Sequence, residues 1–238
     1  MKKLAVPVFS VLAAIGFVVS IYLVFMKTGL EWGIDERSGR LAGSSLFFNQ
    51  KIFYFHIAHA LVLFTAVFVA GICSIVFLWK RNAKYDDIAS ASTEVAVAFG
   101  AAVLVTGSIW AKAAWDVWWN WEPRLTMSLL LWLILVGYVL VRKFAGPSAD
   151  RVAAGMAIFG MVGVPFIYTM VGQDSHPASG ANGVLLNLGT RLLPAALASI
   201  ATFFFWYIAL VVARVQSTRD ERELRELREK ALDLGVLE

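Results

Sequence analysis

The chain has 238 residues, of which 59% are hydrophobic and only 16% are charged. So few charged side chains could not cover that much apolar surface in water, so the composition excludes a soluble globular domain and predicts an integral membrane protein. The formal net charge of +4 reflects basic residues in the segments between apolar stretches, and it gives no reason to expect a nucleic-acid partner.

Six stretches of the chain contain no Asp, Glu, Lys or Arg. In lipid each must be helical, because no water is present to satisfy the backbone polar groups. Four of them are long enough to cross about 30 Å of hydrocarbon, and the third and fourth sit at the lower limit. We therefore expect an all-α polytopic membrane protein with six transmembrane helices. The expected spans are Leu4–Met26, Ile52–Trp79, Val95–Ala111, Leu125–Val141, Val152–Gln173 and Leu192–Ala213.

The first span follows Lys2 and Lys3, as the apolar region of a signal peptide would. It is long, however, and no small-residue cleavage site closes it before Lys27, so we expect a retained helix. The remaining segments connect the spans on alternate sides of the membrane. The outer connections are expected at 27–51, 112–124 and 174–191, and the inner ones at 80–94 and 142–151.

An even number of spans places both termini on one side of the membrane. With the N-terminus inside, the inner segments carry twice as many Lys and Arg residues as the outer ones, mostly because of the C-terminal tail, so we expect cytoplasmic termini. Residues 1–216 are expected to form one membrane domain, and residues 217–238 a cytoplasmic charged helical tail. The leucine stripe of the tail fits either a solvated amphipathic helix or a helix that docks on a partner. The stripe consists of Leu224, Leu227, Ala231 and Leu234.

The glycines indicate where helices can pack closely, and the single cysteine and two absent motifs exclude some kinds of site. Gly100 and Gly107 share a helix face, as do Gly155 and Gly163, which allows close helix packing at each pair. Cys73 is the only cysteine, so an internal disulfide and a cysteine-only metal site are excluded. Neither C-x-x-C-H nor a phosphate-binding G-x-x-x-x-G-K-[ST] occurs, which argues against covalent haem attachment and against nucleotide hydrolysis by that loop.

The most distinctive segment is Trp115–Arg124, which reads W-D-V-W-W-N-W-E-P-R. Its tryptophans fit an aromatic belt at the membrane surface. They also fit a platform for a flat apolar ring, with nearby cations to pair with carboxylates on that ring. Both interpretations stay open on the chemistry alone. The residues concerned are Trp115, Trp118, Trp119 and Trp121, with Asp116, Glu122, Arg124 and Lys112 beside them.

Three histidines are present: His56 near the outer start of the second span, His59 about one turn deeper on the same face, and His176 in the third outer segment. Segments between spans one and two, three and four, and five and six must open on the same side. His56, His176 and the tryptophan segment therefore share one face, which supplies the parts for bis-histidine haem ligation. The alternative is an interfacial His56 and a surface His176 without a metal. His59 is a candidate for supporting a ligand or handling protons.

These residues resemble a known family. Thr106–Lys112, T-G-S-I-W-A-K, followed by W-D-V-W-W-N-W-E-P-R-L-T at Trp115–Thr126, is similar to the tryptophan-rich signature of the CcmC family of haem-handling proteins in cytochrome c maturation. His56, in F-H-I-A, and His176, followed by Pro177, look like the two haem histidines of that family. Asp116 stands where the family usually has Gly, and Glu122 where it usually has Asp.

The resemblance implies non-covalent haem b at an external site of a bacterial inner-membrane protein, on the periplasmic side. His56 and His176 would be the axial ligands of the iron. The tryptophans Trp115, Trp118, Trp119 and Trp121, with Glu122 and Arg124, would complete the site, and Lys112 or Arg191 could also meet the haem propionates. The implied role is haem delivery rather than enzyme catalysis, with presentation to the periplasmic haem chaperone CcmE. The implied partners are the ABC transporter components CcmA and CcmB and the small membrane subunit CcmD.

Three alternatives remain open on the sequence. A CcsA-like haem export or cytochrome c synthase component uses similar parts but is expected to have more spans and more histidines. A b-type haem redox subunit would place paired histidines on facing helices within the membrane. A cofactor-free scaffold or substrate transporter would purify without colour.

Overall fold

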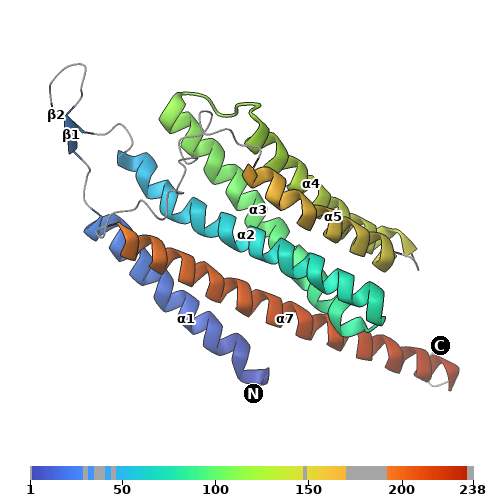
Figure 1. Cartoon of the computed structure of the whole chain (residues 1–238). Coiled ribbons are helices and arrows are strands. Elements are labelled where there is room, and N and C mark those ends of the chain that lie inside the picture. Colours follow the sequence, from blue (N-terminus) through green and yellow to red (C-terminus); the bar gives the residue numbers. More distant parts are fainter. Residues whose placement is uncertain are drawn as a thin grey trace.

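The computed structural model describes residues 2–28, 32–34, 41–43, 47–146, 149–169 and 192–234. Among these residues, six helices are long and apolar enough to cross a membrane (Figure 1). The prediction of an all-α, multi-pass membrane fold with six spans is confirmed. The helices are α1 (Lys2–Tyr22, continued by the π-helical turn η1, Leu23–Lys27), α2 (Phe47–Lys80), α3 (Ala83–Trp115), α4 (Pro123–Phe144), α5 (Ala149–Thr169) and α7 (Leu193–Asp233).

Helices α2 and α3 form the centre of the bundle and pack along each other. Helices α4 and α5 pair on one side of them, and α1 pairs with α7 on the other (Figure 1). The core is apolar and draws on every helix except α1. Its buried residues are Ala58, Val62, Leu63, Ala66, Val67, Val95, Ala96, Phe99, Leu131, Leu135, Val164, Ile167, Phe203 and Tyr207.

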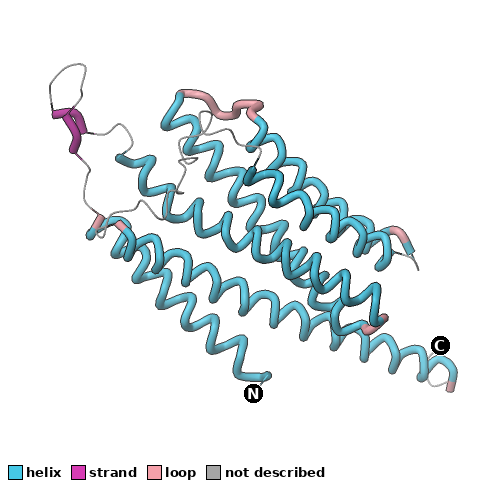
Figure 2. The backbone as a smooth tube through the Cα atoms, in the orientation of Figure 1, coloured by secondary structure: helices cyan, strands magenta, loops and turns pink. Residues whose placement is uncertain are grey.

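Both labelled termini lie at one end of the bundle, and the connection from α3 to α4 lies at the other end (Figure 2). That second end also carries a short antiparallel pair of strands, β1 (Trp32–Ile34) and β2 (Leu41–Gly43), which the sequence did not lead us to expect. We call the end of the bundle that carries the connection from α3 to α4 the loop end. The starts of α2, α4 and α7 and the end of α5 lie there, as the alternation of spans requires.

Helix α3 corrects the prediction of an inner connection at 80–94. The helix begins at Ala83, after Asn82 accepts a hydrogen bond from the Lys84 amide as an N-cap, so only two residues separate it from α2. The charge-free stretch of this helix begins only after Glu94, and the sequence does not show that the charges before it are paired. In the folded chain the acidic residues of this segment pair with arginines from other helices, which makes their burial tolerable.

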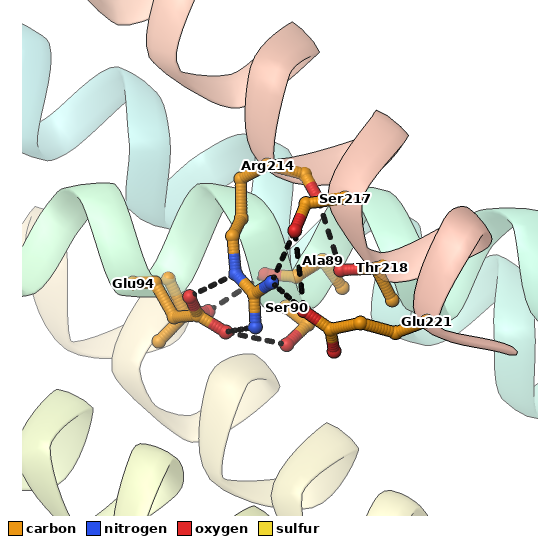
Figure 3. Close-up of polar contacts among 8 residues, drawn as sticks. Ala89, Ser90, Glu94, Arg214, Ser217, Thr218 and Glu221 are labelled. Carbon is orange, nitrogen blue, oxygen red and sulfur yellow. Dashed lines mark hydrogen bonds and ion pairs between the residues drawn. The ribbon is translucent and has the colours of Figure 1, made fainter. Parts of the chain in front are cut away.

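Two of these pairs involve Asp86 and Glu94. Arg142 of α4 donates to both carboxylate oxygens of Asp86, at 2.6 and 2.8 Å. Arg214 of α7 donates from Nε to Glu94 at 2.5 Å, and it also contacts Glu221 seven residues further along α7 (Figure 3). The pairs tie α4 and α7 to the first turns of α3. The expected inner segment is therefore a helix held by ion pairs.

Helix α7 continues without a break from the membrane span into the charged tail and ends at Asp233. Beyond Arg219, whose Nε lies 3.9 Å from Asp87, the leucines of the expected stripe are exposed, among them Leu224 and Leu227. The first turns of the tail are thus fixed to α3. The division at residues 216 and 217 and the docking role of the stripe stay predictions.

The two predicted glycine faces differ. A Cβ on Gly100 would lie 2.6 Å from the Trp132 ring, and one on Gly107 would lie 3.2 Å from the His56 ring, so both glycines permit close packing. At Gly155 and Gly163 no described atom lies within 4 Å of an added Cβ. The prediction of close packing is right for the α3 pair and wrong, among the described residues, for the α5 pair.

At the loop end, Lys51 of α2 fixes the end of α1. The residue is buried, and its ammonium donates to the backbone oxygens of Val24 and Thr28, at 2.5 and 2.6 Å. The last carbonyls of a helix have no partner within the helix, and a cation there satisfies them. Lys51 thereby holds α1 against the turn of α2 that leads to His56.

Candidate functional site

His56 lies on α2 near the loop end, half-buried against α3. Its Nδ1 is 2.9 Å from the hydroxyl oxygen of Thr106, and that hydroxyl also lies 2.6 Å from the Ala102 carbonyl. A hydroxyl has one hydrogen, and the carbonyl can only accept, so Thr106 donates to Ala102 and accepts from His56 Nδ1–H. This arrangement fixes the tautomer in which Nε2 carries the lone pair that a metal needs.

The surroundings of His56 come from one face of α3. Trp110 meets the imidazole edge to face at 5.7 Å between ring centroids, and the absent side chain of Gly107 leaves room for the ring. Thr106 and Trp110 are four residues apart, so they project from the same side of the helix. The sequence indicated Thr106 only as part of a family signature. The spacing of Thr106 and Trp110 was the signal that both contact His56, and it becomes informative once α3 is known to pack on α2.

The tryptophan segment forms the connection between α3 and α4. Trp118 is 62% exposed and Trp121 is 74% exposed, whereas Trp119 is partly covered and packs edge-on against Trp121 at 5.9 Å. Trp115 is the last residue of α3, and its side chain lies outside the described part. Two broad apolar surfaces are therefore left open beyond the end of α3. A flat apolar molecule could stack on them.

Asp116 ends α3 in a left-handed backbone conformation, with φ 61° and ψ 21°. Glycine is the usual residue at this position of a helix C-terminus, because a Cβ is strained there. The structure thus gives a physical reason for the glycine that the resemblance led us to expect. The Asp116 carboxylate instead bonds to the Lys112 ammonium at 2.5 Å, and this hydrogen bond lowers the pKa of Asp116.

Glu122 and Arg124 flank the start of α4. Glu122 is the last residue before the helix and Arg124 lies in its first turn, and both are half-buried. Burial raises the pKa of the Glu122 carboxyl, and the nearby positive charge of Arg124 opposes that rise. The loop connecting α3 to α4 therefore carries cations at both ends, Lys112 before it and Arg124 after it.

His176 falls within 170–191, outside the described residues, so the pairing of His56 with His176 stays a prediction. Arg191 lies in the same segment. The flanking elements do follow the predicted alternation: α5 ends at Thr169 and α7 begins at Leu193, both at the loop end (Figure 1).

His59 lies one turn deeper than His56, among aromatic side chains of the core. Its Nδ1 is 2.7 Å from the Phe55 carbonyl, which only accepts, so Nδ1 is the donor. The Phe203 ring lies 4.2 Å away and the Phe99 ring 5.4 Å away, measured between centroids. His59 thus belongs to the packing of α2, α3 and α7.

Comparison with known proteins adds to this geometry. Residues 1–230 match the family model "CcmC: Heme exporter protein C". The chain is 27% identical over 207 residues to "Heme exporter protein C" of Paracoccus denitrificans, covering 84% of each chain. It is 30% identical to the protein of the same name from Bradyrhizobium diazoefficiens, covering 74% of this chain and 69% of the relative. It is also 30% identical to that of Escherichia coli K12, over 63% of this chain and 60% of the relative.

The family match spans nearly the whole chain, so it includes all six spanning helices, the tryptophan loop and His56. The chain therefore belongs to the CcmC family of haem exporter proteins.

Proposed function

We propose that this protein binds haem at the loop end of the bundle and hands it to a partner during c-type cytochrome maturation. The observation that carries the proposal is the hydrogen bond between His56 Nδ1 and Thr106, which holds an imidazole at the end of the bundle that also carries the exposed tryptophans Trp118 and Trp121. Membership of the CcmC family, whose relatives are named haem exporters, supports the same function.

The described residues fit haem in kind. The iron of b-type haem takes an imidazole nitrogen, which His56 offers. The apolar faces of the ring suit the exposed indoles of Trp118 and Trp121. The haem carboxylates suit the ammonium of Lys112 and the guanidinium of Arg124. We propose His176 as the second axial ligand, and Trp115, Trp119 and Glu122 as further members of the site.

An open site suits transfer rather than storage. Trp118 and Trp121 are exposed, so a haem held against them would be within reach of a second protein while His56 would hold the iron. We propose that this second protein is the periplasmic haem chaperone CcmE, that the haem is non-covalent haem b, and that CcmA, CcmB and CcmD assemble with this chain. The loop end then faces the periplasm from the bacterial inner membrane, with both termini in the cytoplasm.

The test is haem quantification on the purified protein and its variants, with absorption spectra of the oxidised and reduced states. His56→Ala and His176→Ala are each expected to lose the bis-histidine spectrum and most of the bound haem. His59→Ala is the matched control, because it removes an imidazole from the same helix one turn deeper. Wild-type spectra in both ligand variants would show that the ligand assignment is wrong.

The aromatic surface needs its own test. Replacement of Trp118 and Trp121 together by Ala is expected to weaken haem loading and transfer to CcmE. Trp79→Ala is the control, because Trp79 is 81% exposed at the opposite end of α2. Equal loading in both variants would favour an aromatic belt, and a protein that purifies without haem under all conditions would favour a cofactor-free scaffold.

A further inference from the structure

The Lys112–Asp116 pair stands at the base of the tryptophan loop. The ammonium of Lys112 lies 2.5 Å from Oδ1 of Asp116, and the two side chains are 40% and 90% exposed. Asp116 is two residues before Trp118. A cation that suits a haem carboxylate is therefore already bound to a carboxylate of the chain.

The backbone at Asp116 does not account for that carboxylate. A left-handed residue is accommodated best by glycine, and asparagine adopts this conformation more readily than most other residues. Either would end α3 in the same way without a charge. The feature that aspartate adds at this position is the ion pair with Lys112, together with the negative charge that remains if Lys112 turns to another partner.

An exposed ion pair of this kind is weak and exchanges readily, because water and salt screen it. A haem propionate is ionised at neutral pH, as other carboxylates are. The ammonium of Lys112 has three hydrogens and can contact two carboxylates, but its single positive charge neutralises only one of them. If the propionate takes Lys112, the released Asp116 carboxylate adds a negative charge close to the ligand.

We propose that Asp116 competes with a haem propionate for Lys112. Asp116 pairs with Lys112 when no haem is bound, loses that pairing when the propionate binds, and pairs with Lys112 again when haem leaves. Asp116 thereby weakens haem retention and favours release to the next carrier. This inference rests on the proposed haem function and assigns to one residue of the site the tuning of its affinity.

The deciding variant is Asp116→Asn, which keeps the shape and the backbone preference of the side chain and removes its charge. The probes are haem and haem dimethyl ester, whose carboxylates are blocked, each titrated into the purified protein. Asp116→Asn is expected to bind haem about two- to five-fold more tightly, as suits the loss of one exposed charge contact. It should bind the ester with unchanged affinity, and it should release haem more slowly to apomyoglobin.

Two further variants separate this proposal from simpler explanations. Lys112→Met is expected to reduce the preference for haem over the ester, because only Arg124 then remains to pair with the carboxylates. In the double variant the effect of Asp116→Asn is expected to be smaller, because no Lys112 is left for which the two carboxylates compete. Asp220→Asn, which removes an exposed aspartate from the tail of α7, is expected to change neither affinity. Equal haem affinity in wild type and Asp116→Asn would overturn the proposal that Asp116 competes for Lys112. A gain in affinity that extends to the ester would overturn it as well.

The outcome for His56→Ala distinguishes failure of the proposed competition by Asp116 from failure of the proposed haem function. If His56→Ala lowers haem affinity and Asp116→Asn leaves it unchanged, haem binding stands and the proposed competition is wrong. If His56→Ala binds haem as the wild type does, the proposed function itself fails at its first ligand.

Discussion

His56 of α2 and Thr106 of α3 are joined by a 2.9 Å hydrogen bond at the loop end of the bundle. The bond determines which imidazole nitrogen carries the lone pair, and it holds the ring in one orientation. Partners of this kind typically change metal affinity 10- to 100-fold when they are removed. The two helices that meet here are also the central pair of the fold, so the candidate ligand stands on its most extensively packed part.

Replacement of Thr106 by Val removes the acceptor and keeps the shape of the side chain. We expect haem affinity to fall about 10- to 100-fold, with a shift in the spectrum of the bound haem, as measured by titration. Thr106→Ser should retain most of the affinity, because its hydroxyl can take the same place. Ser108→Ala is the control, since within the described part of the chain the Ser108 hydroxyl bonds to Leu104 of its own helix. Wild-type haem affinity in Thr106→Val would show that the hydrogen bond from His56 to Thr106 does not prepare the imidazole for haem binding.

A methyl group at Gly107 would press on the imidazole of His56. An added Cβ lies 3.2 Å from Cε1, so the ring must move by a few tenths of an ångström. We expect Gly107→Ala to lower haem content measurably and Gly155→Ala to leave it unchanged, because at Gly155 no described atom lies within 4 Å. Alanine favours the helix over glycine at both positions, so a loss confined to Gly107 would not reflect helix stability. Haem per mole of purified protein is the measurement.

The stability of the loop should depend on pH through Glu122. Burial raises the pKa of this carboxyl above its ordinary value of 4.5, so the folded protein favours the neutral form. The stabilisation is fully present below the ordinary pKa and is lost as the pH rises through the raised one. We expect Glu122→Gln to have a higher apparent Tm than wild type at pH 7 and the same Tm near pH 4, as followed by tryptophan fluorescence. A difference that does not vary with pH would contradict this origin.

The ion pair between Arg142 and Asp86 is expected to stabilise the opposite end of the bundle. Arg142→Met leaves a mostly buried carboxylate without its guanidinium, which typically destabilises a protein by about 3–5 kcal/mol. The double variant Arg142→Met, Asp86→Leu should recover most of that loss, because no unpaired charge remains. Arg151→Met, at an exposed position on α5, is the control. Thermal unfolding in detergent gives the comparison, and recovery absent from the double variant would argue against the pair as the cause.

Helix α3 shows where sequence reasoning failed on the fold. The expected span began at Val95, because Asp86, Asp87 and Glu94 were counted as charges that a membrane helix cannot hold. Arginines that are distant in the sequence neutralise Asp86 and Glu94, which a count along the chain does not reveal. The helix therefore begins at Ala83.

Some features of the candidate site were predictable from the sequence, and others were not. The exposure of Trp118 and Trp121 and the position of His56 at the loop end follow from the alternation of spans, so they were predictable. The partners of His56 were not, because hydrogen bonding between Nδ1 and Thr106 depends on the rotation of α2 and α3 about their own axes. The left-handed conformation of Asp116 could be guessed only from the usual glycine of the related signature.

By itself the sequence determined the membrane class, the six spans and the face on which the tryptophan loop must open. The physical reason is that each depends on local hydrophobicity and on the parity of crossings, which are properties of the chain taken in order. Tertiary structure alone decided the tautomer of His56, the pairing of buried carboxylates with distant arginines and the fixing of α1 by Lys51. These depend on contacts between side chains that packing brings together, and no spacing along the chain encodes them.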